Sequence, residues 1–162
     1  MSSFKAYPNR RLILASLAAL AGCGFEPVYA PGNRAHGLRG RIEIAVPADE
    51  EGFALVRRLE DRLGSTAGGD LVLNAEIRVD EEAVGLLPDG SISRYSVLGQ
   101  VNWSLSDSSG PQMSGDERSF TSYSATSTTV ATIVAQRDAR RRLMIILADR
   151  IVADILAEAD AL

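Results

Sequence analysis

The chain has 162 residues, which is enough for a single domain with its own hydrophobic core. Apolar residues make up 46% and charged residues 23% of the chain, and the net charge of −4 gives no indication of nucleic-acid binding. The single cysteine, Cys23, cannot form a disulfide within the chain, and the single histidine, His36, leaves no ligand set for a metal site.

Residues 1–22 have the layout of a secretory signal peptide. A basic stretch is followed by a short apolar run, residues 12–20, which is too short to span a bilayer. The run ends in Leu-Ala-Gly-Cys, which resembles the lipobox of bacterial lipoproteins, where the cysteine receives a diacylglyceryl group and becomes the first residue of the mature chain. We therefore expect lipidation, including palmitate, at Cys23. A buried helix or a true membrane anchor is the alternative.

Residues 23–40 are predicted to form a lipidated N-terminal tether. Residues 31–40 are rich in Gly, Pro and Arg and show no hydrophobic period. Gly24, rather than an aspartate, follows Cys23, and in bacterial lipoproteins this favours passage to the outer membrane. His36 lies in the tether. A Ser-His-Asp hydrolase site that uses His36 is therefore the alternative, and a chain without catalytic residues is the main prediction.

Residues 41–162 are predicted to form the folded domain, beginning with a strand and a helix. Residues 41–46 alternate between apolar and polar side chains, as a half-buried strand does. A helix is expected from Pro47 to Leu63, because Pro47 can open it, acidic residues occupy its first turn and Gly64 follows it. Its apolar stripe is predicted from Phe53, Val56, Leu59 and Leu63, with Leu55 beside them.

Three more strands are expected to form a meander. Residues 70–80 alternate clearly, and the Leu-Pro-Asp-Gly turn at 87–90 leads into a return strand over 93–106. A second turn at 107–111 leads into a polar strand over 115–125, with Phe120 and Tyr123. Tight turns between consecutive strands predict antiparallel pairing.

The last element is a long helix, expected over residues 130–159 and capped by Ser127 or Thr128. Three arginines of its first half, Arg137, Arg140 and Arg141, share one side. They form either a solvated helix face or a patch that contacts anions. The second half carries a broad apolar stripe made of Leu143, Met144, Ile146, Leu147, Ile151, Ile155 and Leu156.

The predicted fold is α/β of the α+β type, with the order β-α-β-β-β-α. It is a two-layer sandwich in which a four-stranded, mostly antiparallel sheet packs against two helices. The pairing of the first strand is left open by the patterning. The sequence has no nucleophile elbow and no Gly-rich phosphate loop, so no enzyme activity and no cofactor are predicted.

Residues 23–29, Cys-Gly-Phe-Glu-Pro-Val-Tyr, resemble the mature N-terminus of the LptE family of lipopolysaccharide-assembly outer-membrane lipoproteins. The element order over residues 41–159 is similar to that of the family. The resemblance implies an outer-membrane lipoprotein that faces the periplasm and the barrel lumen. There it would plug and help assemble the LptD β-barrel, in a 1:1 pair, and take part in lipopolysaccharide transport to the outer leaflet.

The resemblance also implies contact with the phosphates of lipopolysaccharide. We expect Arg94, just after the hairpin turn, and Arg137, Arg140 and Arg141 to make it, because guanidinium groups form paired, charge-assisted hydrogen bonds with phosphate. No nucleic-acid partner and no metal are expected. The alternative function is a different lipid-anchored periplasmic binding or scaffold module of the cell envelope.

Overall fold

The computed structural model describes residues 37–45, 49–125 and 128–159. The predicted signal peptide, Cys23 and His36 lie outside these ranges. The described elements follow the predicted order, and they are β1 (Ile42–Ile44), α3 (Glu50–Leu63), β2 (Leu71–Leu86), β3 (Ile92–Asp107), β4 (Gly110–Ser124) and α4 (Thr129–Ala157).

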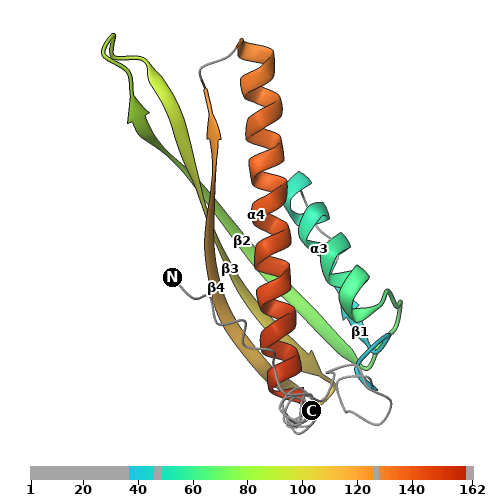
Figure 1. The fold of residues 1–162 in the computed structure, drawn as a ribbon. Helices are drawn as coiled ribbons and strands as arrows, with labels where there is room; N and C mark the ends of the chain where they lie inside the picture. The colour runs from blue at the N-terminus through green and yellow to red at the C-terminus, as the bar shows by residue number, and fades with distance from the viewer. Residues whose placement is uncertain (1–36, 46–48, 126–127, 160–162) are drawn as a thin grey trace, which may run out of the picture.

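The four strands form one sheet in the order β1-β2-β3-β4, and both helices cover the same face of it (Figure 1). The strands β2, β3 and β4 are antiparallel neighbours, as their tight turns predict. The short β1 is parallel to β2, with Ile42 opposite Leu71. This confirms the two-layer α+β sandwich and answers the open question of where the first strand pairs.

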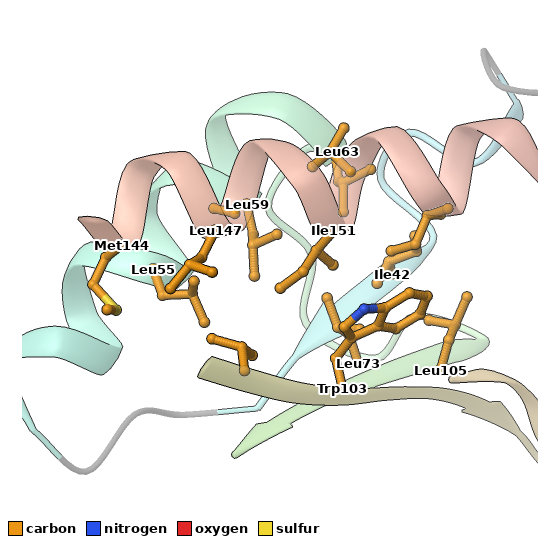
Figure 2. Packing of buried hydrophobic residues seen from close by; sticks show 14 of the residues in the cluster. Ile42, Leu55, Leu59, Leu63, Leu73, Trp103, Leu105, Met144, Leu147 and Ile151 are labelled. Atoms are coloured by element: carbon orange, nitrogen blue, oxygen red, sulfur yellow. The ribbon is translucent and has the colours of Figure 1, made fainter. Parts of the chain in front are cut away.

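The core lies between the sheet and the helices (Figure 2). Since side chains alternate along a strand, one set faces the helices and the other faces away from them. Trp103 of β3 packs beside Ile42, Leu73 and Leu105, under Ile151 of α4. The buried strand residues that face the helices are Ile42, Leu71, Leu73, Val97, Val101, Trp103, Leu105, Met113 and Tyr123.

The ends of α3 follow local sequence rules, but its buried face differs from the prediction. The side chain of Asp49 caps the start by accepting a hydrogen bond from Gly52 N at 2.7 Å. Gly64 ends the helix with a φ of +87°, which glycine adopts without strain. The prediction that Phe53 belongs to the buried stripe is wrong, because Phe53 is 61% exposed and Gly52 is buried in its place. Leu55, Leu59 and Leu63 are buried.

The long helix α4 lies close against the sheet at Gly99. A Cβ atom at this glycine would lie 2.8 Å from Leu143 Cδ2 and 3.0 Å from Leu147 Cδ1, so the bare backbone makes room for the helix. On the other side, Asp149 of α4 accepts hydrogen bonds from Arg58 and Arg62 of α3 at 3.0 Å. The two helices are thus fixed to the sheet and to each other.

Leu38, which the sequence assigns to the tether, is buried in the core. The backbone N–H of Gly40 donates to the carbonyl of Leu63 at 2.8 Å, which ties this segment to the end of α3. The packed fold therefore includes the last residues before the predicted boundary at residue 41.

Candidate functional site

Arg140 joins both helices to the sheet. Its Nη1 donates to Glu51 of α3 at 2.8 Å, and its Nη2 donates to Glu81 of β2 at 3.2 Å. Glu81 also accepts hydrogen bonds from Gln136 of α4 at 2.9 and 3.1 Å and from the hydroxyl of Tyr123 on β4. These contacts connect α3, α4, β2 and β4. We call the five residues that make them, Glu51, Glu81, Tyr123, Gln136 and Arg140, the Arg140 junction.

The junction holds Glu81 in its charged form. Burial disfavours the carboxylate, but the hydrogen bonds from Tyr123, Gln136 and Arg140 outweigh burial and lower the pKa of Glu81. Burial and the hydrogen bond to Glu81 raise the pKa of the Tyr123 hydroxyl. Both shifts favour a single protonation state near neutral pH, which suits a structural connection rather than proton transfer.

A pocket of about 230 Å³ opens beside the junction, between the start of α3 and the first half of α4. The Nε atom of Arg140, one of the lining residues, is buried and has no acceptor among the described residues. The pocket contains both carboxylate and guanidinium groups, so its charge selects neither a cation nor an anion. Its lining residues are Glu50, Glu51, Ala54, Gln136, Arg137, Arg140 and Arg141.

The structure does not bring the four predicted arginines to one place. Arg94 is exposed on β3, on the face of the sheet that the helices leave open. Arg137 and Arg141 are exposed on α4, whereas Arg140 is half-buried in the junction. Arg141 forms an ion pair with Asp138. Within the described ranges, Arg137 has no ion-pair partner.

The outer face of the sheet, opposite the helices, is polar. Leu98 of β3 and Phe120 of β4 form an exposed apolar pair on this face, because they lie directly opposite each other in the register. Phe120 is 71% exposed, although an aromatic ring gains much from burial. The polar residues of this face include Asn74, Glu76, Arg78, Asp80, Gln100, Asn102, Ser104, Ser114, Asp116, Arg118 and Ser122.

Sequence reasoning missed the Arg140 junction and the exposure of Phe120. The partners in the junction are separated by up to 89 residues in the chain, so no local motif connects them. Phe120 alternates with polar residues just as a core residue does, but its register and its exposure place it on the outer face.

The described residues contain no cluster of three or more His, Cys, Asp or Glu side chains that could hold a metal ion. Among the same residues, no helix is both long enough and apolar enough to cross a membrane.

Comparison with known proteins identifies the family. Residues 40–155 match the family described as LptE, lipopolysaccharide-assembly. No curated protein matches this chain in sequence. Several solved lipoprotein structures share the fold.

A lipoprotein from Caulobacter crescentus is 20% identical, with a TM-score of 0.63, over 79% of this chain and 98% of its own. The rare lipoprotein B of Shewanella oneidensis is 16% identical, with a TM-score of 0.55, over 74% of this chain and 93% of its own. Lipoprotein B of Nitrosomonas europaea is 12% identical, with a TM-score of 0.57, over 76% of this chain and 86% of its own. These structures support the fold alone. The family match covers more than half of the sequence, and the chain belongs to the LptE lipopolysaccharide-assembly family.

Proposed function

We propose that this chain is an outer-membrane lipoprotein, anchored through lipidated Cys23, that occupies the lumen of an LptD-type β-barrel. In a 1:1 complex it would support assembly of the barrel and take part in lipopolysaccharide transport to the outer leaflet. The family match supports a role in lipopolysaccharide assembly, and the lipobox supports the anchor. The proposed role includes no catalytic step and no cofactor.

The proposed contact with the barrel rests on one observation, which is that the outer face of the sheet is polar. Barrel lumens are polar and hydrated, and this face presents amide, hydroxyl and charged groups that can bind such a wall directly or through water. Leu98 and Phe120 form an apolar pair within it. An apolar centre surrounded by polar residues is the usual arrangement of a protein interface.

Exchange of this apolar pair for charged residues tests the contact. We expect Leu98→Asp combined with Phe120→Asp to reduce roughly tenfold the barrel protein that co-purifies with the tagged full-length chain. Both side chains are exposed, so the substitutions should leave the fold intact, which circular dichroism would check. Phe53→Asp, which charges an exposed apolar residue on α3 away from this face, is the matched control. If the parent chain recovers no large barrel protein from solubilised outer membranes, the proposed role is wrong.

For the phosphates of lipopolysaccharide, we propose contacts from Arg94, Arg137 and Arg141. These three guanidinium groups are exposed, and arginine binds phosphate through paired hydrogen bonds. Arg140 remains a proposed contact, although its two Nη atoms are held by Glu51 and Glu81 and its Nε is buried.

A further inference from the structure

The two edges of the sheet differ in length. The strand β1 at one edge has 3 residues, whereas β4 at the other edge has 15. Strands of globular proteins usually have about five or six residues, and a long edge strand offers its unpaired N–H and C=O groups to strands of other chains. No proline and no register shift interrupts β4 between Met113 and Ser124. The edge of β4 is therefore regular and suited to strand pairing.

The hydrogen-bond pattern indicates which backbone groups of β4 point away from the sheet. The N–H of Ala125 donates to the carbonyl of Ser93 on β3 at 2.9 Å. In an antiparallel pair, residues that bond to the neighbouring strand alternate with residues that point away from it. The odd-numbered residues of the regular stretch therefore bond to β3, and the even-numbered ones point to the edge. The residues that present their backbone groups at the edge include Ser114, Asp116, Arg118, Phe120 and Ser122.

Two arginines of α4 occupy carbonyl groups at this edge. Arg150 Nη1 donates to the carbonyl of Arg118 at 2.7 Å, and Arg142 Nη2 donates to the carbonyl of Ser122 at 3.4 Å. The helix α4 runs along β4 (Figure 1), so both side chains reach the edge from one element. Two of the acceptors that an added strand would use are thus bonded within the chain.

Carboxylates hold both guanidinium groups near the edge. Arg142 Nη1 lies 3.0 Å from Asp138 Oδ2, one helical turn earlier, and Arg150 Nη1 lies 3.8 Å from Glu117 Oε2 on β4. The side chains of Arg142 and Arg150 are nevertheless 53% and 52% exposed. Exposed ion pairs contribute little to stability, so the main effect of these contacts is to fix where the two positive charges lie.

We infer that the edge of β4 is a strand-pairing surface that fits a second copy of this chain, and that Arg142 and Arg150 keep it closed. An added strand would have to displace both guanidinium groups from the carbonyls. A closed barrel has no free edge to offer, whereas a second copy carries the same regular edge. Two β4 strands can pair antiparallel about a two-fold axis. This inference goes beyond the proposed function, because it concerns pairing of the chain with itself.

Removal of the two arginines tests the inference. We expect the full-length chain to be a monomer, and Arg142→Ala with Arg150→Ala to raise the fraction of dimer by roughly tenfold. Native mass spectrometry of the chain purified in detergent counts the copies at matched concentrations. Arg57→Ala with Arg137→Ala removes the same charge from exposed positions on α3 and α4, so this matched control should remain a monomer.

A proline distinguishes edge pairing from other ways of associating. Ser122→Pro removes an N–H that points to the edge and takes no part in pairing with β3, so the fold should tolerate it. Added to the double variant, Ser122→Pro should restore the monomer. Ser122→Ala, which keeps the N–H, should leave the dimer intact.

Two results would overturn the inference. One is a double variant that stays a monomer, and the other is a dimer that persists after Ser122→Pro is added. Circular dichroism checks that each variant is folded. Arg150→Ala alone removes the shorter contact from an exposed side chain, so it should fold like the parent chain and give a smaller rise in dimer. If this single variant gives no rise, the inference is also wrong.

Discussion

At the scale of single residues, the surroundings of two glutamates of the sheet shift their pKa values in opposite directions. Hydrogen bonds in the Arg140 junction lower the pKa of Glu81 in spite of its burial. Glu117 of β4 is half-buried beside Asp154 of α4, and burial together with this second acidic group raises its pKa, although Arg150 partly opposes the rise. The pKa values of Glu81 and Glu117 therefore make opposite contributions to the pH dependence of stability.

The sign follows from which state holds the proton more tightly. The pKa of Glu117 is higher in the folded protein than its ordinary value of 4.5, so the folded state binds this proton more tightly than the unfolded state. Its contribution to stability is largest below pH 4.5 and falls as the pH rises through the folded value. Glu81, with its lowered pKa, contributes stability above its ordinary pKa and loses it in acid.

We therefore predict that Glu117→Gln is more stable than the parent chain at about pH 7 and that the difference shrinks towards about pH 4. Glutamine is neutral at every pH, so it removes the unfavourable charge beside Asp154. Urea denaturation at a series of pH values measures the effect. Glu82→Gln, an exposed change on β2, is the control for the loss of one carboxylate. A stability difference that is the same at every pH would contradict this account.

At the scale of elements, the position of α4 on the sheet depends on a single missing side chain. Gly99 is buried in β3, and Leu143 and Leu147 of α4 occupy the space where its Cβ would be. Well-packed cores tolerate added atoms poorly, because the neighbours must leave their preferred rotamers or the backbone must move. The glycine thus sets how closely this helix can approach the sheet.

For this reason, Gly99→Ala should lower the free energy of unfolding by about 1–3 kcal/mol. Ser104→Ala, on the outer face of the same strand, should change it by less than about 0.5 kcal/mol. Because the clash is with Leu143, the double variant Gly99→Ala with Leu143→Val should lose less than the sum of the two single variants. Strict additivity in the urea midpoints would mean that the close approach is not the cause.

The elements also show how far sequence patterns predict this fold. The order and type of the elements were predicted from three kinds of pattern, and the structure confirms them. These are the alternation along β2, β3 and β4, the turn sequences at 87–90 and 107–111, and the absence of Gly and Pro from the long helix predicted over residues 130–159. The rotation of α3 was not predictable, because Phe53 and Leu55 are both apolar and adjacent to the same stripe. Packing against α4 buries Leu55 and leaves Phe53 exposed, and this choice depends on residues about 90 positions away.

At the scale of the whole molecule, the two helices cover one face of the sheet and leave the other open (Figure 1). The molecule therefore presents a polar outer face with the Leu98–Phe120 pair and, at one end, an apolar surface next to exposed arginines. In the proposed function, the outer face meets the barrel and the lipid anchor keeps the molecule at the membrane.

The proposed lipid anchor at Cys23 leads to a prediction about where the whole chain is found. We expect Cys23→Ser to remain at full length, without lipid and outside the membrane fraction, because the serine hydroxyl offers no thiol for the diacylglyceryl group. Two or more acyl chains bind far more firmly than one, at about 0.8 kcal/mol per buried CH₂, so their loss should release the protein. Mass spectrometry of the N-terminal peptide and fractionation measure both effects. Gly24→Ser, which keeps the thiol, should be processed like the parent chain.

The amino-acid sequence by itself determined the element order, the two-layer class and the expected lipidation of Cys23, because all three depend on local patterns of charge, periodicity and turn residues. Only the tertiary structure decided that β1 pairs in parallel with β2, that Arg140 lies between Glu51 and Glu81, and that Arg94 is on the opposite face from α4. It also showed that Val130 and Phe120 are exposed. These features depend on contacts between residues far apart in the chain and on where the helices stop covering the sheet, and no local pattern contains that information.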